Sequence, residues 1–181
     1  DKQEQDATLS MQQTSDGGYI LAGSTQSVDA SRSTYAYLLK VDEDGNKMWE
    51  NYASDGLLRS VRQTSDGGYI AAGDKLRSER QTSDGGCEEK INNNIPTGDC
   101  SFALGGVYLL KLDANGNKTW EKSFRWSAPD GSGLDTGYSV QQTSDGGYII
   151  AAEMHYSSNP WQNDILLIKT DGNGNIYGYK G

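Results

Sequence analysis

Short apolar runs, separated by glycine-rich polar turns, recur along the whole chain. Three of these runs begin with Tyr-Ile and cover residues 19–24, 69–73 and 148–152. They are apolar at successive positions, which is the pattern of a strand covered on both faces. Gly-rich turns between short β-rich runs are typical of all-β proteins, and no segment has the period of an amphipathic helix. We therefore expect an all-β fold.

The apolar runs belong to a repeat. Gln-Thr-Ser-Asp-Gly-Gly-Tyr-Ile occurs three times, and each copy is followed by a run of the type Tyr-Leu-Leu-Lys-x-Asp that leads into a Gly-Asn turn. Such self-similarity indicates a repeat architecture, in which one unit buries its apolar surface only by stacking on its neighbours. We expect one domain over residues 1–181, with repeats at about 9–58, 59–137 and 138–181.

Each repeat is predicted to form four antiparallel strands. The first strands are residues 10–14, 60–64 and 139–143, and the second strands are the Tyr-Ile runs. The third strands are residues 35–41, 107–112 and 164–170, and the fourth are residues 47–52, 118–124 and 176–179. In the first turn we expect Asp to cap the backbone and Gly to supply a positive φ. Nine residues are predicted to be buried: Tyr19, Tyr69, Tyr148, Ile20, Ile70, Ile149, Leu39, Leu110 and Leu167.

The second repeat contains an insertion over about residues 75–103. Residues 76–86 nearly copy residues 58–68, but Glu79 and Cys87 stand where the first copy has apolar anchors. We therefore interpret this copy as part of the insertion and not as another buried hairpin.

The last repeat lacks an anchor. Gly178 stands where the other two repeats have Trp49 and Trp120. The final strand is therefore predicted to be weak, and contact between the first and last repeats of different chains is expected because both flanks lack a neighbour.

The repeat has a resemblance among known proteins. Residues 139–151, followed by Leu-Leu-Ile-Lys-Thr-Asp-Gly-Asn-Gly-Asn, resemble the repeat of secreted or cell-surface β-propeller proteins of bacteria and archaea. The resemblance covers nearly the whole chain apart from the insertion. It implies propeller-like blades, one per repeat, and a secreted or cell-surface location, but it names no activity.

The number of repeats leaves the assembly open. Propellers have about 4–8 blades, and this chain has three repeats. The chain is then a fragment, or two chains complete a six-bladed ring, or the repeats stack without closing. A β-trefoil is the alternative fold, because it also consists of three four-stranded repeats and needs no partner.

The charge balance excludes some classes of function. The formal net charge is −9, whereas proteins that bind nucleic acid usually carry a basic surface. No apolar run approaches the length that spans a bilayer. We therefore expect no nucleic-acid partner and no membrane insertion.

The acidic turns have one feature of a calcium site. Asp42, Asp44 and Asn46 present oxygen ligands at alternating positions, as at the start of a calcium-binding loop. The twelve-residue loop with its distal Glu is absent, so we favour a hairpin turn built from good turn formers.

Catalytic chemistry has little support in the sequence. The single histidine, His155, has no second histidine for a zinc site, and no Gly-x-Ser-x-Gly motif is present. We expect no enzyme, no catalytic residues and, calcium aside, no cofactor.

Aromatic side chains in the connections are candidates for ligand binding. Trp126, Trp161 and Tyr156 lie between predicted strands, and the face of a Trp ring suits a sugar. The alternative interpretation is that these rings fold over a blade edge.

Three functions remain after these exclusions. The first is a non-enzymatic extracellular repeat module for binding or assembly, whose partners are copies of itself or missing repeats. The second is a lectin-like carbohydrate binder, and the third is the scaffold domain of a larger secreted enzyme. A fold cannot decide among them, since function depends on individual sites.

A disulfide between Cys87 and Cys100 is the first testable prediction. Both cysteines lie in the insertion, where a bond would close a short loop and contribute about 3 kcal/mol in the chain-entropy model. Extracellular proteins keep such bonds oxidised. Thiol titration of unreduced, denatured protein should find no free thiol. Two free thiols would rule the bond out.

Overall fold

The chain is all-β. The computed structural model describes residues 6–26, 34–76, 80–81, 87–88, 104–124, 135–155 and 163–180. Within these residues every regular element is a strand. The strands are β1 (Asp6–Gln13), β2 (Tyr19–Gln26), β3 (Thr34–Val41), β4 (Lys47–Gln63), β5 (Tyr69–Leu76), β6 (Arg80–Gln81), β7 (Cys87–Glu88), β8 (Leu104–Leu112), β9 (Lys118–Phe124), β10 (Thr136–Gln142), β11 (Tyr148–His155), β12 (Asn163–Thr170) and β13 (Ile176–Lys180).

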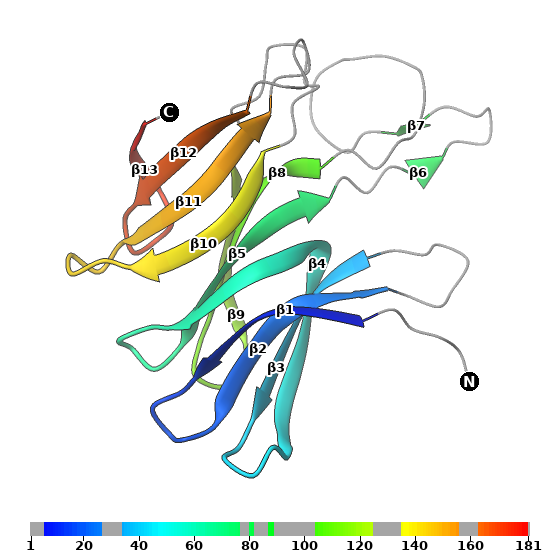
Figure 1. The fold of residues 1–181 in the computed structure, drawn as a ribbon, viewed down its shortest axis with the longest axis vertical. Helices are drawn as coiled ribbons and strands as arrows, with labels where there is room; N and C mark the ends of the chain where they lie inside the picture. Colours follow the sequence, from blue (N-terminus) through cyan, green and yellow to red (C-terminus); the bar gives the residue numbers. More distant parts are fainter. Residues whose placement is uncertain are drawn as a thin grey trace.

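The strands form three four-stranded antiparallel sheets, one for each repeat, as predicted. Sheet 1 consists of β1, β2, β3 and residues 47–55 of β4. Sheet 2 consists of residues 56–63 of β4 with β5, β8 and β9. Sheet 3 consists of β10 to β13. Figure 1 shows sheet 1 at the bottom, sheet 2 in the middle and sheet 3 at the top. The sheets are open and do not close into a barrel.

The strand β4 differs from the prediction. Two separate strands were expected at residues 47–52 and 60–64, but one continuous strand joins the outer edge of sheet 1 to sheet 2. Ala53 and Leu58, which lie in the joining segment, are both buried in the core between the two sheets. Extended backbone therefore carries the chain between sheets while it buries these side chains.

The first turn of each repeat has the predicted geometry. Gly17, Gly67 and Gly146 have φ values of 86°, 81° and 81°. In the first repeat the backbone N–H of Gly18 donates to Asp16 Oδ1 at 3.1 Å, and the other two repeats contain the same bond. Each Asp thus caps its turn, as expected.

Two apolar cores lie between the sheets. Tyr69 and Ala71 of β5 belong to the core that sheet 2 shares with sheet 1. Ile70 and Ala72 of the same strand belong to the core that sheet 2 shares with sheet 3. Successive side chains of a strand point to opposite faces, so β5 is covered on both of its faces.

The burial predictions were right for the middle sheet and partly wrong for the outer sheets. Five of the nine residues are buried: Ile20, Tyr69, Ile70, Leu110 and Tyr148. Tyr19, Leu39 and Ile149 are half-buried, and Leu167 is exposed. The error has one cause, because among the described sheets only sheet 2 has a neighbouring sheet on both faces.

The insertion contributes a separate short ladder. Strands β6 and β7 pair antiparallel and join none of the three four-stranded sheets. Their side chains, including that of Cys87, and the whole of Cys100 lie outside the described residues, so the disulfide stays a prediction.

Replacing one isoleucine in each of two sheets tests the two-core arrangement. Ile70 is fully buried, whereas Ile149 occupies the same repeat position in sheet 3 and is half-buried. Ile70→Ala should cost about 2–5 kcal/mol of unfolding free energy. Ile149→Ala should cost clearly less, because it leaves no closed cavity. Urea unfolding at low protein concentration measures both, and equal costs would contradict the arrangement.

Candidate interaction surface

The contact between sheets 1 and 2 is anchored by hydrogen bonds from side chains to backbone. The backbone N–H of Val61 donates to Ser10 Oγ at 3.2 Å, and that of Gln63 donates to Gln12 Oε1 at 2.7 Å. In the opposite direction, the N–H of Ser15 donates to Gln63 Oε1 at 2.8 Å. These bonds fix one sheet against the other along their first strands.

The contact between sheets 2 and 3 uses the same repeat positions. The N–H of Val140 donates to Ser60 Oγ at 3.3 Å, and the N–H of Ser65 donates to Gln142 Oε1 at 2.8 Å. Sheet 3 therefore sits on sheet 2 as sheet 2 sits on sheet 1.

One ion pair distinguishes the second contact from the first. Arg59 lies 2.7 Å from the fully buried carboxylate of Asp74, which also accepts the N–H of Gly137 from sheet 3 at 3.2 Å. Burial raises the pKa of Asp74, while Arg59 and these hydrogen bonds oppose that rise. A Cβ at Gly137 would lie 2.7 Å from the carbonyl oxygen of Gly73, so this close approach requires glycine.

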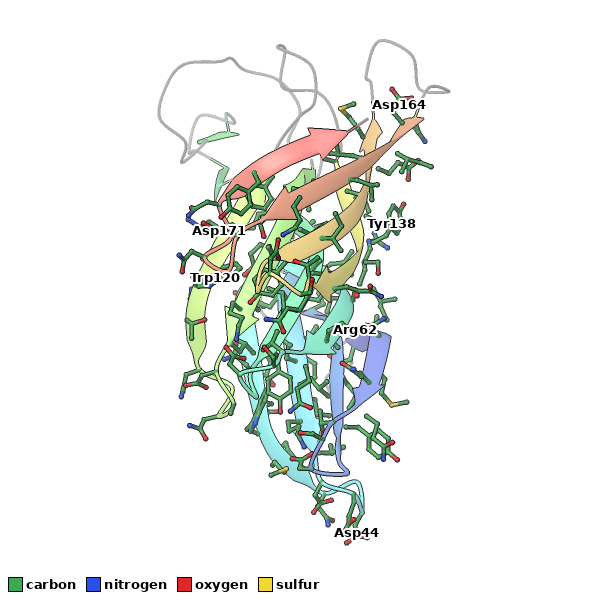
Figure 2. All side chains as sticks on the ribbon, turned by 90° about the vertical axis from the view of Figure 1, so that its left-hand side faces the viewer. Asp44, Arg62, Trp120, Tyr138, Asp164 and Asp171 are labelled. Carbon is green, nitrogen blue, oxygen red and sulfur yellow. The ribbon has the colours of Figure 1, made fainter. Side chains whose placement is uncertain are left out.

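In each contact between sheets, a tryptophan of one sheet packs against a tyrosine of the next. The ring of Trp49 from sheet 1 lies edge-on to Tyr69 at 5.5 Å between centroids, and Trp120 from sheet 2 meets Tyr148 at 5.9 Å. Figure 2 shows Trp120 beside the turn of sheet 3 that begins at Asp171. Edge-to-face pairs of this kind stabilise by about 0.5–1.5 kcal/mol beyond their buried area.

A lysine in the third strand of each sheet binds the turn of the same sheet. Lys40 pairs with Asp16 at 2.9 Å, Lys111 with Asp66 at 2.9 Å and Lys169 with Asp145 at 2.8 Å. Each Nζ also donates to the carbonyl of the following residue. A buried ammonium group needs such partners, because an unpaired charge is costly to remove from water.

The exposure of these lysines depends on the next sheet. The Lys40 and Lys111 side chains are 2% and 7% exposed, whereas Lys169, whose sheet has no following sheet, is 28% exposed. The same local ion pair is therefore covered in sheets 1 and 2 and partly open in sheet 3.

The paired carboxylates stay ionised well into the acidic range. Hydrogen bonds from the Thr14 hydroxyl and from Lys40 lower the pKa of Asp16 to about 2. Burial raises the pKa of Asp66, but hydrogen bonds from Thr64 and Lys111 outweigh it and hold the pKa at about 2. Lys169 and Thr143 lower the pKa of Asp145 in the same way.

Sheet 1 has an uncovered face, which we call the leading face. It is the face that sheets 2 and 3 bury against the sheet before them. Met11 on this face is 61% exposed, whereas Val61 and Val140 at the same repeat position are 0% and 1% exposed. Four further apolar residues of the leading face are half-buried although their counterparts are buried: Tyr19, Leu21, Leu39 and Val41.

Sheet 3 has the opposite uncovered face, which we call the trailing face. It is the face that sheets 1 and 2 bury against the sheet after them. Ile165 is 76% exposed here, whereas Ala36 and Val107 at the same position are fully buried. Three further apolar residues complete the trailing face: Ile149, Ala151 and Leu167.

The two uncovered faces are the two halves of one contact. In sheet 3, Ser139 and Gln141 occupy the repeat positions of Ser10 and Gln12. In sheet 1 those two side chains accept hydrogen bonds from the backbone of sheet 2. Terminal repeats of stacked proteins usually carry a polar outer face. Both outer faces here are apolar, so each has the composition of a face that packs on another sheet.

The first carboxylate of each acidic turn accepts hydrogen bonds from groups of the same turn. Asp42 Oδ1 accepts the N–H of Asp44 at 3.0 Å and that of Asn46 at 2.8 Å, while Oδ2 accepts the Asn46 side chain at 3.0 Å. Asp113 and Asp171 form the same turn. These bonds account for the Asp-x-x-Gly-Asn pattern without a metal. In the described residues no group of three or more His, Cys, Asp or Glu side chains is placed to hold a metal ion. Calcium binding stays a prediction.

The other candidate site residues cannot be placed. Trp126, Trp161 and Tyr156 lie outside the described residues, and His155 is described only by its backbone in β11. The sugar-binding prediction therefore remains open.

Sequence reasoning missed the residues that anchor the sheets. It overlooked the three lysines and the bonds made by Ser10, Ser60 and the glutamines. A signal was present, since a lysine directly follows two aliphatic residues in all three third strands. A charge kept at a buried repeat position indicates an ion pair.

Comparison with known proteins does not place the chain in a family. The sequence matches no protein-family model and no curated protein. The resemblance to propeller repeats therefore rests on the repeat motif.

No helix in the described part of the chain has the length and apolar character needed to cross a bilayer.

Acid unfolding tests the lysine–aspartate pairs. Because the folded pKa of Asp66 is about 2 and its ordinary value is 3.8, the pair contributes stability above about pH 4. That stability is lost as the pH falls toward 2. Asp66→Asn should lower stability at pH 5 and flatten its decline between pH 4 and 2, measured by urea unfolding. Asp44→Asn, at an exposed turn position, controls for the lost charge. An unchanged slope in Asp66→Asn would contradict the assignment.

Proposed function

We propose that the chain is a non-enzymatic extracellular repeat module that assembles sheet upon sheet. In this proposal the trailing face of sheet 3 packs on a leading face, and the leading face of sheet 1 packs on a trailing face. The partner is another copy of the chain or a further repeat of the same kind. The observation that carries the proposal is the exposure of Met11 at a position that is buried in both other sheets.

Burial of apolar area supports the proposal energetically. Removing apolar surface from water contributes about 25 cal/mol per Å². The leading and trailing faces carry apolar residues at the positions that form the two internal cores. A contact built from them would resemble one that the chain already makes twice.

The contact is heterologous, because it joins two different faces. Repeating a heterologous contact gives a ring if the rotation closes and a filament if it does not. Two copies of three sheets would supply six blades, which is within the usual range of propellers. The proposal therefore allows a dimeric ring as well as a longer chain of copies.

The alternatives rest on other residues. Carbohydrate binding depends on Trp126, Trp161 and Tyr156, which lie outside the described residues. A role as the scaffold of a larger enzyme would place the catalytic residues in another segment. The two apolar faces support assembly more directly than either alternative.

Light scattering across a dilution series tests assembly. The wild-type chain should show a mass that rises with concentration. Met11→Glu should lower that mass, because it places a charge in the contact. Met48→Glu is the matched control, since Met48 is 56% exposed and its repeat counterparts Thr119 and Tyr177 are also exposed. The control should assemble like the wild type.

The trailing face is tested in the same way. Ile165→Glu should reduce assembly, whereas Tyr177→Glu, at a residue that is 75% exposed, should not. Both changes add one negative charge, so net charge cannot explain a difference between them. A monomer mass for the wild type at every concentration would overturn assembly between copies of this chain and leave a further repeat as the partner. Equal effects of test and control variants would overturn the proposal.

A further inference from the structure

Two sheets contribute differently to the tryptophan contact. We call the sheet that supplies the tryptophan ring the donor and the sheet that receives the ring the acceptor. The donor contributes a Trp on its fourth strand. The acceptor contributes a Tyr at the start of its second strand and a Gly in its last turn. Trp49 meets Tyr69 and Gly116, and Trp120 meets Tyr148 and Gly174.

The acceptor glycine leaves room for the indole. Gly116 has φ +82°, and a Cβ on it would lie 2.7 Å from the Trp49 ring. Gly174 has φ +76°, and a Cβ there would lie 2.9 Å from the Trp120 ring. Both glycines are buried. A side chain at this turn position would therefore displace the tryptophan.

Sheet 1 has an acceptor side without a donor. Tyr19 and Gly45 occupy the acceptor positions, and Gly45 has the same backbone conformation with φ +85°. Unlike its two counterparts, Gly45 is exposed, and no heavy atom lies within 4 Å of a Cβ built on it. We call Tyr19 and Gly45 the indole seat. Figure 2 shows the neighbouring Asp44 at the free lower end of the molecule.

Sheet 3 does not supply the missing donor. Gly178 pairs with Lys169 in the register in which Trp49 pairs with Lys40 and Trp120 with Lys111. The donor position of sheet 3 is thus present in the backbone but carries no ring. A second copy that packed through sheet 3 would leave the indole seat empty.

We propose that the indole seat binds a tryptophan presented by the fourth strand of another sheet of the same repeat type. The partner at the leading face is then a repeat that carries Trp at the position of Gly178, in preference to sheet 3 of a second copy. This inference rests on the proposed assembly function, and it names the chemistry of the partner.

A second contact of the donor strand agrees with this choice. The side-chain amide of Asn51, two residues after Trp49, donates to the carbonyl oxygen of Gly116 at 2.7 Å. In the contact between sheets 1 and 2, the acceptor turn thus binds its neighbour through a ring contact and through the carbonyl of the same glycine. Gly45 offers both features to an incoming strand. Trp49 and Trp120 are partly buried against the two cores, and tryptophan is enriched among the residues that dominate binding.

The chain itself can serve as the probe. A Cβ at Gly178 meets no atom within 4 Å, and its φ is not in the left-handed region, so Gly178→Trp fits the backbone. A donor chain would carry Met11→Glu, which blocks its leading face, with either Gly178 or Gly178→Trp. An acceptor chain would carry Ile165→Glu, which blocks its trailing face. Only one contact between the two chains then remains, and its Kd is measured by calorimetry or fluorescence anisotropy.

The expected result is a clear difference between the two donors. The Gly178→Trp donor should bind the acceptor at least about tenfold more tightly than the Gly178 donor. Gly45→Asn in the acceptor should remove this gain, because Asn tolerates positive φ and places a side chain in the seat. Gly146→Asn is the matched control, since Gly146 has φ +81° and open space around it. Gly178→Phe gives a second donor if the Trp variant folds poorly.

The outcomes separate this inference from the proposed function. Equal affinity of the Gly and Trp donors would overturn the indole seat while leaving assembly intact. Binding by the Trp donor alone would support the seat and show that the wild-type chain does not assemble through sheet 3. If neither donor binds, both proposals are wrong.

Discussion

Face-to-face packing of apolar sheets holds this chain together. Each repeat forms a four-stranded sheet whose middle strands carry apolar side chains on both faces, so each sheet needs a neighbour on both sides. Sheet 2 has two neighbours, and β5 is buried along most of its length. Within the described part of the chain, sheets 1 and 3 have one neighbour each. The same requirement that creates the two cores therefore leaves two apolar faces uncovered.

Polar contacts decide how the sheets meet. Apolar packing alone is not directional, but the serine and glutamine side chains of the first strands bind backbone N–H groups of the adjacent sheet at fixed positions. The lysine–aspartate pairs hold each third strand against its own turn. Two sheets can then stack in one orientation, and the orientation repeats from one contact to the next. Because the orientation repeats, the uncovered leading face matches the uncovered trailing face of another such chain.

The sequence predicted the repeat and the strands well, because the short apolar runs and the Asp-Gly-Gly turns are local signals. Most of the four strands per repeat lie within a few residues of their predicted bounds, and β4 differs because no turn interrupts residues 53–59. Burial was predicted less well. Leu109 and Leu167 occupy the same repeat position, yet Leu109 is buried and Leu167 is exposed, since sheet 2 packs against a following sheet through this face and sheet 3 does not in the described residues.

The candidate surface was harder to predict than the fold. The missing Trp at Gly178 was visible in the sequence and pointed to the last repeat. The indole seat of Tyr19 and Gly45 was not visible, because the partnership of a Tyr, a Gly and a Trp from different repeats appears only when the sheets are stacked. The pairing of the lysines was hidden for a similar reason, as their aspartates lie in a different part of each repeat.

The methionine methyl groups offer the most direct test of the claim that the leading face packs on another sheet. The chain has three methionines, and two of them, Met11 and Met48, are similarly exposed in the single chain. Methyl NMR with a soluble paramagnetic probe reports the solvent access of each methyl as the protein concentration is raised. The account predicts that Met11 becomes protected while Met48 stays accessible. If the two methyl groups remain equally accessible at every concentration, the leading face is not an assembly surface.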